Sequence, residues 1–348
     1  MKCFNVGILG TGSIAQSMAF TLNVLKDKGE VVPYAIASRS LKKAEKFARE
    51  WHFEKAYGSY ETLVSDPAVD LIYIATPHSL HYEHALLCLN HSKNTLVEKS
   101  FTANAKQAQK LLSLAADKKV FLAEAVWTRY MPSRKIIADL LDSGAIGRFT
   151  TLDATFSVPI HEIPRMHDPS LCGGALLDLG VYVLTTASMY FGDEIIETDS
   201  SCSLYPTGVD ATDNIILTYK DGKKATLHAS MTEESHNCAK VCGSAGYLTW
   251  ESNNNPRNIE LHSPDGTLLQ KISIPEQING YEYEILACKR AIEDGEAECE
   301  DMKAELLDRF GNVPKSVDNL IRISLIRVQA HERYVTEIKG KVGCITFY

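Results

Sequence analysis

The chain has 348 residues, of which 45% are hydrophobic and 23% charged, and its formal net charge is -8. This composition is ordinary for a globular protein, and the length predicts two domains. The acidic balance argues against a surface that coats nucleic acid, and we find no apolar run of the roughly 18 residues that a membrane span needs. The first strand is expected from Phe4, which leaves no room for a signal peptide. The cysteines are scattered singly, which favours free thiols in the cytoplasm.

Strands and helices alternate over residues 1–125, which predicts one doubly wound α/β domain with a parallel sheet. Asp70–Ala75 is a continuous apolar run, as expected of a strand buried on both faces. Further strands are expected from Phe4 and over Val31–Ser38, Asn94–Val97 and Val120–Ala123, with helices over Leu41–Trp51, Leu80–Asn90 and Thr102–Asp117.

The pattern changes after residue 125, where strands follow one another and Asp-Gly pairs supply hairpin turns. An α+β domain with a mostly antiparallel sheet and helices on one face is the natural interpretation. The other face must then be wet or bury against a partner. We expect helices over Lys135–Ser143, Gly174–Tyr190 and Tyr281–Asp294, and strands over Phe149–Phe156, Asn214–Tyr219, Lys224–Ser230, Gly246–Glu251, Asn258–His262 and Leu268–Ile274.

A glycine turn joins the first strand to the first helix. Its pattern, Gly10-x-Gly12-x-x-Ala15, is the dinucleotide-binding fingerprint with alanine at the third position. Gly10 permits the tight turn, Gly12 leaves the backbone accessible to a pyrophosphate, and Ala15 lets the helix lie close to the strand. The phosphates would bind at the positive end of the helix. The alternative is a strand-to-helix turn without a ligand.

The end of the second strand indicates which dinucleotide the site prefers. A carboxylate about twenty residues past the glycines binds the ribose diol of NAD. Here the sequence is Ala37-Ser38-Arg39-Ser40, and Lys43 follows. Arg39 and Lys43 suit a 2′-phosphate, with Ser38 donating a hydrogen bond, although a solvated basic start of a helix is the alternative. We therefore expect NADP as the cofactor.

Three residues form a candidate catalytic set. Lys99 follows a strand at the edge where ligands bind in such sheets, and Asp178 and Tyr182 are four residues apart in an expected helix. Tyrosine has an ordinary pKa of about 10, so proton exchange near neutral pH requires a nearby cation, for which Lys99 is the candidate. Asp178 would orient Tyr182 or bind substrate. The alternatives are a surface Glu-Lys pair, a helix carboxylate and a core tyrosine.

Five motifs occur together and in order. They are Gly10–Ala15, Ala75-Thr76-Pro77-His78 with His81, Glu98-Lys99, Glu124–Pro132 and Gly173–Tyr182. This set resembles the Gfo/Idh/MocA oxidoreductase family over about residues 1–302. Glu124–Pro132 and Tyr182 look most like its dimeric dihydrodiol dehydrogenase branch, whose members include NADP-dependent xylose dehydrogenases.

The resemblance implies a Rossmann domain over 1–125 and a substrate and oligomerisation domain over 126–302, whose large open sheet forms the interface of a homodimer. It implies hydride transfer between NADP(H) and a hydroxyl-bearing carbon of a small-molecule sugar or diol. Lys99 and Tyr182 would be the catalytic pair, with Asp178 beside them. Ser100 replaces the family's usual proline, and Tyr182 replaces the histidine of many members, so mechanisms based on that histidine do not apply.

The same resemblance implies which residues line the cofactor. They are Gly10, Thr11, Gly12, Ser13, Ile14, Ser38, Arg39, Lys43, Thr76, Pro77, His78, His81, Glu98, Lys99, Trp127 and Arg129. Trp127 and Arg129 follow the dinucleotide domain directly, where they would wall the substrate or pin the domain junction. The histidines have no metal-like spacing, so we expect no metal site.

Residues 303–348 do not look like the end of this family. Leu306–Leu320 and the residues that follow resemble part of the C-terminal domain of bacterial transcription-repair coupling factor. The sequence has no Gly-x-x-x-x-Gly-Lys-Ser/Thr loop for a motor, so we transfer no DNA-repair function and expect no nucleic-acid partner. We interpret this part as a fused segment, with helices over Lys303–Phe310 and Val317–Tyr334 and a strand over Val342–Tyr348.

Two other functions stay open. One is a nucleotide-binding regulator that keeps the cofactor site but does no chemistry, against which the intact Lys99 and Tyr182 argue. The other is an interaction module recruited through residues 303–348.

Overall fold

The computed structural model describes residues 3–296, so the helices and the strand expected beyond Lys303 lie outside the described residues. The described chain forms two compact units, one made of residues 3–131 and 276–296 and the other of residues 132–275. The sequence-based division assigned the helix near Tyr281 to the second domain, whereas the structure returns this helix to the first unit.

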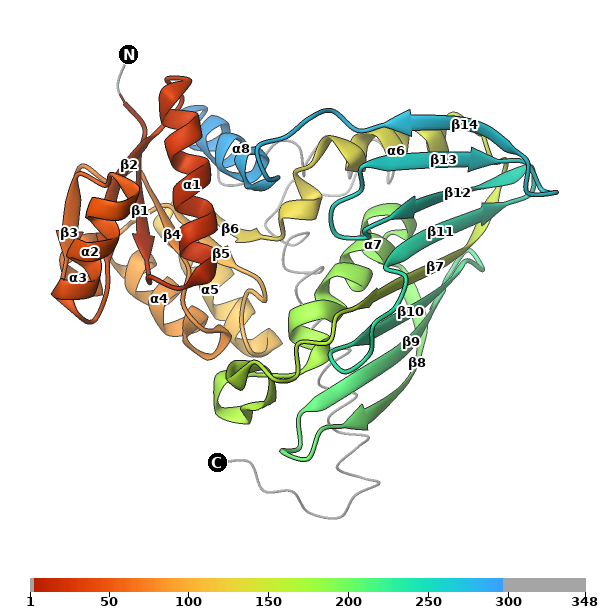
Figure 1. Ribbon diagram of the computed structural model, residues 1–348, viewed down its shortest axis with the longest axis horizontal. Helices are drawn as coiled ribbons and strands as arrows, with labels where there is room; N and C mark the ends of the chain where they lie inside the picture. The colour runs from red at the N-terminus through yellow and green to blue at the C-terminus, as the bar shows by residue number, and fades with distance from the viewer. Residues whose placement is uncertain (1–2, 297–348) are drawn as a thin grey trace. The chain divides into compact units, whose positions relative to one another are not determined.

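The first unit is built on a six-stranded parallel sheet with the order β3-β2-β1-β4-β5-β6 (Figure 1). The strand order reverses between β1 and β4, which is where such sheets bind ligands beyond the carboxyl ends of the strands. Both strands are buried along nearly their whole length, which explains their apolar sequences. The strands are β1 (Asn5–Leu9), β2 (Val32–Ala37), β3 (Lys55–Tyr57), β4 (Leu71–Ile74), β5 (Thr95–Glu98) and β6 (Leu122–Ala125).

The helices of this unit largely follow the sequence-based expectation. β3 and the short helix α3 were not expected, because three- and five-residue elements carry too little periodicity. The fifth helix begins three residues later than expected, because the Asn104 side chain accepts the N–H of Gln107 as a cap. The helices are α1 (Ser13–Asp27), α2 (Leu41–Trp51), α3 (Tyr60–Val64), α4 (His81–Asn90), α5 (Ala105–Lys118) and α8 (Tyr281–Glu293).

The second unit is built on an eight-stranded sheet with the order β14-β13-β12-β11-β7-β10-β9-β8. All neighbours are antiparallel except β7 and β10, which run parallel. The sheet confirms the expected open, mostly antiparallel architecture, although β8 and β11 were missed. The strands are β7 (Phe149–Ser157), β8 (Ile195–Leu204), β9 (Asp210–Tyr219), β10 (Lys224–Ser230), β11 (Cys238–Gly243), β12 (Gly246–Glu251), β13 (Asn258–His262) and β14 (Leu268–Ser273).

Helices α6 (Pro132–Asp142) and α7 (Val181–Phe191) belong to this unit, and α7 packs on β7 and β10. A π-helical turn, Leu176–Gly180, leads directly into α7. The segment Pro169–Phe191 is long and apolar enough to cross a membrane by length and composition alone, but most of it is buried in the protein, as in a core helix.

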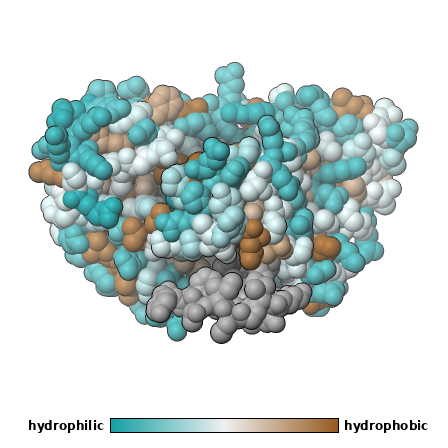
Figure 2. Space-filling model, turned by 60° about the horizontal axis from the view of Figure 1, so that its bottom comes forward, coloured by the Kyte–Doolittle hydropathy of each residue, from teal (hydrophilic) through white to brown (hydrophobic). Residues whose placement is uncertain are grey.

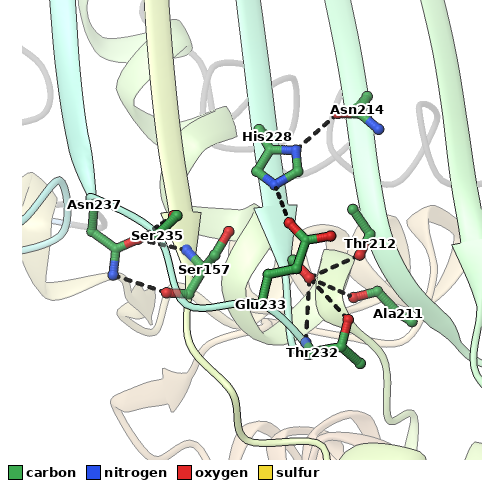
Figure 3. A network of polar contacts seen from close by, with 10 residues as sticks. Ser157, Ala211, Thr212, Asn214, His228, Thr232, Glu233, Ser235 and Asn237 are labelled. Atoms are coloured by element: carbon green, nitrogen blue, oxygen red, sulfur yellow. Dashed lines mark hydrogen bonds and ion pairs between the residues drawn. The ribbon is translucent and has the colours of Figure 1, made fainter.

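A polar network fastens the strands of this sheet near one of its ends (Figure 3). The Asn237 side chain accepts a hydrogen bond from the Ser157 N–H and donates one to the Ser157 carbonyl, so it pairs with β7 as a neighbouring strand would. His228 on β10 bonds Asn214 on β9, and Thr212 of β9 bonds the Ser230 hydroxyl of β10. The start of β9 is therefore held in register by side chains as well as by the backbone ladder.

Candidate active site

The glycine turn after β1 has the geometry that a dinucleotide site requires. Gly10 has a φ of 105°, and a Cβ there would lie 2.6 Å from the carbonyl oxygen of Ala75. The Gly10 N–H donates to the carbonyl of Ala37, which ties the turn to the end of β2. Only glycine satisfies both the dihedral angle and the close approach.

Gly12 faces open space. A Cβ at this position would meet no atom of the described chain within 4 Å. Gly12 is also the N-cap of the fifteen-residue helix α1, whose first turn carries no acidic residue and whose cap makes no side-chain hydrogen bond. The positive N-terminal end of α1 therefore begins beside an open position without a side-chain cap, which we call the cradle at Gly12, and such an end suits a pyrophosphate. Ala15 is fully buried, as close helix packing demands.

The basic edge after β2 is larger than the sequence indicated. Ser38 is buried, whereas Arg39 and Lys43 are exposed at the start of α2. Two aromatic rings missed by the sequence analysis belong to the same edge: Tyr60 and His84 meet edge-to-face at 4.7 Å. Burial raises the pKa of Tyr60 and lowers that of His84, and the Arg39 charge opposes the first shift and reinforces the second. The missed residues come from α3, which was not expected, and from α4.

The residues after β4 contact both the basic edge and the chain that follows β5. Thr76 bonds the ring of His84 through its hydroxyl at 2.9 Å, so it lies beside the basic edge. His81 is fully buried, and its two ring nitrogens lie 2.7 Å from the Ser100 carbonyl and 2.8 Å from the Thr76 carbonyl. His81 therefore joins the chain after β4 to the chain after β5. Pro77 precedes the 3₁₀ turn His78–Leu80.

Lys99 immediately follows β5, at the carboxyl edge of the sheet. Its backbone N–H donates to the Glu98 carboxylate at 3.1 Å, and the hydroxyl of Tyr73 donates to the other oxygen of Glu98. Glu98 is buried, whereas Lys99 is partly exposed. Glu98 thus anchors the backbone of Lys99 at the end of β5.

Trp127 stacks on Tyr281 with ring centroids 4.6 Å apart and an interplanar angle of 17°. Gly280, with a φ of 105°, makes room for the indole, because a Cβ there would approach the ring to 2.9 Å. The buried indole nitrogen of Trp127 has no hydrogen-bond partner among residues 3–296. This N–H is a donor that a bound ligand is able to satisfy, and the nearby Arg129 is buried.

Asp178 and Tyr182 both lie in the second unit, in the π-helical turn and the first turn of α7. Both are buried, and the Arg165 guanidinium binds the two carboxylate oxygens of Asp178 through two nitrogens, each at 3.2 Å. Tyr182 meets Phe156 of β7 edge-to-face at 5.0 Å. π-helical turns are rare and are frequently found at functional sites. Arg165 is a partner of Asp178 that no local sequence signal revealed.

The sites are thus divided between the two units: the glycine turn, the basic edge and Lys99 belong to the first, and Asp178 and Tyr182 to the second. Among residues 3–296, no group of three or more His, Cys, Asp or Glu side chains is arranged to hold a metal ion.

Three segments of the chain match models of known protein families. Residues 4–125 match an oxidoreductase family with an NAD-binding Rossmann fold, and residues 135–249 match the GFO/IDH/MocA C-terminal domain. Residues 289–348 match the TRCF domain, which confirms the resemblance noted for the end of the chain.

Curated relatives include trans-1,2-dihydrobenzene-1,2-diol dehydrogenases. The Xenopus tropicalis protein is 38% identical over 243 residues, which cover 70% of this chain and 73% of the relative. The Homo sapiens protein is 35% identical over 244 residues, covering 70% and 72%. These values confirm the dihydrodiol dehydrogenase resemblance.

Two solved structures share the fold. KijD10, a 3-ketoreductase from Actinomadura kijaniata bound to NADP and TDP-benzene, has a TM-score of 0.80 at 24% identity, covering 93% of this chain and 96% of its own. A levoglucosan dehydrogenase in complex with NADH and L-sorbose has a TM-score of 0.81 at 18% identity, covering 97% and 98%. At such identities the likeness shows the two-domain fold, as expected.

Proposed function

Because the chain belongs to the Gfo/Idh/MocA oxidoreductase family, we propose that it is an NADP-dependent dehydrogenase whose substrate is a sugar or a trans-dihydrodiol. The reaction oxidises a CH–OH group or reduces the corresponding carbonyl. The observation that carries this proposal is the open cradle at Gly12, which leads to an edge rich in basic and aromatic residues at Arg39, Tyr60 and His84. The named activity of the dihydrodiol dehydrogenase relatives supports the substrate class.

The first unit would hold the cofactor. Gly10, Thr11, Gly12, Ser13 and Ile14 would surround the pyrophosphate, and Ser38, Arg39 and Lys43 would bind a 2′-phosphate. Farther along the same edge are Thr76, Pro77, His78, Glu98, Lys99, Trp127 and Arg129. We assign His81 a positioning role, since both of its ring nitrogens lie against backbone carbonyls. A bound nicotinamide would take up or deliver the hydride.

Tyr182 would handle the proton of the reaction. When an alcohol is oxidised, the Tyr182 phenolate would accept the hydroxyl proton of the substrate and become the phenol, and in the reverse direction the phenol would return that proton. The Lys99 ammonium would stabilise negative charge on the Tyr182 oxygen and on the oxygen of the substrate. Asp178, held by both nitrogens of Arg165, would fix the helix that presents Tyr182 and hold a substrate hydroxyl.

The direct test is a panel of aldoses and trans-dihydrodiols with NADP or NAD, followed by the fluorescence of the reduced cofactor. Turnover of one class with NADP supports the proposal. Cofactor binding without turnover of any class would favour the alternative, a non-catalytic nucleotide-binding regulator.

We also propose that the chain forms a homodimer in the cytoplasm through the open face of its eight-stranded sheet. Large apolar side chains are exposed on strands of that sheet: Ile196, Leu204, Ile216, Leu268 and Leu269. The face of the molecule in Figure 2 is mostly hydrophilic, with hydrophobic residues in small groups. Light scattering of the full chain and of Ile216→Asp measures the association, and a monomeric wild type would refute it.

A further inference from the structure

Two buried carboxyl groups near the start of β9 have no role in the assignments above. Asp213 is 2% exposed and Asp210 9%, and both belong to the second unit. This part of β9 is firmly placed, because the Met231 N–H donates to the Ala211 carbonyl and Thr212 bonds Ser230 (Figure 3). The two carboxyl groups are therefore fixed in position.

Asp210 holds the start of the helical segment that carries Asp178 and Tyr182. Its Oδ2 accepts the backbone N–H of Leu176, the first residue of the π-helical turn, at 2.5 Å. Gly174 has a φ of 123°, and a Cβ there would lie 2.2 Å from the other oxygen of Asp210. The carboxylate thus packs directly on the backbone of Gly174.

The loop formed by Gly173 and Gly174 is also closely packed on its other side, against Arg165 and Met166. A Cβ on Gly173 would lie 2.5 Å from the Met166 carbonyl oxygen, and the Gly174 N–H donates to that carbonyl. The side chain of the preceding residue, Arg165, binds Asp178. The loop is therefore clamped between Asp210 and residues 165–166, and the helix cannot shift along its axis without breaking one of these contacts.

The Asp213 side chain is buried, and its Oδ2 has no hydrogen-bond partner among residues 3–296, which favours the neutral acid. Burial, and then the adjacent charge of Asp210, raise the pKa of Asp213 well above its ordinary value. The residue directly across on β8 is Cys202, whose thiol is also kept protonated, since burial and the two aspartates raise its pKa to about 12. On β10 the cross-strand neighbour is Ala229, and the one ionisable side chain of the π-helical turn is Asp178, which Arg165 binds.

We propose that Asp210 and Asp213 share one proton and act as positioning residues for the active-site helix. Asp213, as the neutral acid, donates its proton to an oxygen of Asp210, and Asp210, as the carboxylate, accepts the Leu176 N–H. A pair of acids with one proton between them avoids two adjacent buried charges. The acceptor at the helix start favours the charge on Asp210, because the N-terminus of a helix attracts an anion. The catalytic consequence rests on the function proposed above for Tyr182.

The sign of the pH effect follows from linkage. Asp213 binds its proton more tightly when folded than when unfolded, so its contribution to stability is fully present below about pH 4 and is lost as the pH rises toward its folded pKa. An asparagine at 213 keeps a hydrogen-bond donor and cannot ionise. Asp213→Asn should therefore remove the loss of stability at high pH. Asp213→Ala cannot ionise either, but it also lacks the hydrogen-bond donor.

The experiment compares the variants Asp213→Asn, Asp213→Ala and Asp210→Asn with the exposed control Asp199→Asn on β8. We expect Asp213→Asn to melt at least as high as the wild type at pH 8–9, with an advantage that grows with pH, and to keep kcat within about threefold. Asp210→Asn and Asp213→Ala should lower kcat about tenfold or more, the size expected when a charged hydrogen bond is lost, while the cofactor Kd stays unchanged.

Infrared spectroscopy of the wild type gives a second reading that needs no activity. We expect the band of a protonated carboxyl group at neutral pH, absent from Asp213→Asn and retained in Asp199→Asn. Absence of that band in the wild type, or a melting temperature of Asp213→Asn below the wild type at alkaline pH, would overturn the proposal. If these two readings hold but Tyr182→Phe is fully active, the positioning pair stands and the catalytic assignment fails.

Discussion

The two units bury an acidic side chain in opposite ways. In the first unit, burial by itself raises the pKa of Asp66, but hydrogen bonds from Lys55, Tyr57 and the Ala68 N–H outweigh it and hold the pKa at about 2. In the second unit, Asp213 has another carboxyl group for a neighbour, and its pKa is raised well above the ordinary value. Burial raises the pKa of both carboxyl groups, and their partners decide whether that rise is outweighed, as at Asp66, or reinforced, as at Asp213.

The difference matches the tasks proposed for the units. By the proposed function, the first unit would present positive groups to a phosphate-bearing cofactor, and the second would present a helix start to a substrate. Changes in the first unit should therefore alter cofactor binding or stability in acid, and changes in the second should alter turnover. The predictions below test that division, from the largest expected effect to the smallest.

Tyr182→Phe should lower kcat by at least about 10²-fold, the usual scale of general acid–base catalysis, while the cofactor Kd stays unchanged. Tyr190→Phe is the matched control, since Tyr190 is a buried tyrosine of the same helix.

Lys99→Met should lower kcat to a similar extent, although Lys99 belongs to the first unit. The double variant should be little worse than either single one, because the proposed mechanism has Lys99 and Tyr182 acting together on one proton transfer. Near-normal turnover in both single variants would contradict the assignment.

Gly12→Ser should weaken cofactor binding by about tenfold or more without loss of stability. Serine is a favoured N-cap, and the position is open, but the hydroxyl would compete with the pyrophosphate for the helix N–H groups. Gly10→Ala should instead lower the melting temperature, because alanine tolerates neither the φ of 105° nor the close Ala75 carbonyl. Cofactor titration and thermal unfolding of both variants separate the two effects; equal behaviour would argue against the cradle.

Arg39→Asp should shift the preference from NADP toward NAD, by about tenfold in the ratio of the two kcat/KM values. The change removes a partner of the 2′-phosphate and adds a repulsive charge. Arg49→Asp, at the other end of α2, is the control and should leave the ratio unchanged. A wild type that prefers NAD would already contradict the cofactor proposal.

Asp66→Asn should destabilise the protein by about 1–3 kcal/mol at neutral pH, because a charged acceptor of three hydrogen bonds is lost. The folded pKa of Asp66 lies below its ordinary value, so its stabilisation is present above about pH 4 and is lost as the pH falls toward 2. Urea unfolding from pH 3 to 7 should show the wild type and the variant converging in acid. A difference independent of pH would mean that packing, not charge, is what Asp66 provides.

The sequence predicted those features that a short stretch of chain determines by itself. Gly10 and Gly12 were found because their conformations are required within one turn, and β4 because burial on both faces makes its residues apolar. The edge strand β8 was missed because its positions are all half-buried or exposed, so its sequence carries no clear alternation of apolar and polar residues.

Other features depend on residues far apart in the chain. Asp210 binds the backbone of Leu176, 34 positions earlier, and Arg165 finds Asp178 across a loop. Tyr60 and His84 meet only because α3 and α4 lie beside each other. No periodicity or spacing encodes such meetings, so the sequence indicated Asp178 but neither the Arg165 that binds it nor the Asp210 that binds Leu176.

The place of β7 in its sheet also affects the order in which the sheet is able to assemble. β7 is central in its sheet, with β10 on one edge and β11 on the other, yet both neighbours follow it by more than sixty residues. During synthesis at roughly 5–20 residues per second, both edges of β7 thus remain unpaired for several seconds. The β8–β9–β10 meander is able to form first, since its neighbours are adjacent in sequence, and then supply an edge for β7. During this interval β7 exposes unpaired backbone groups along both edges, and an unpaired strand edge is a template for aggregation.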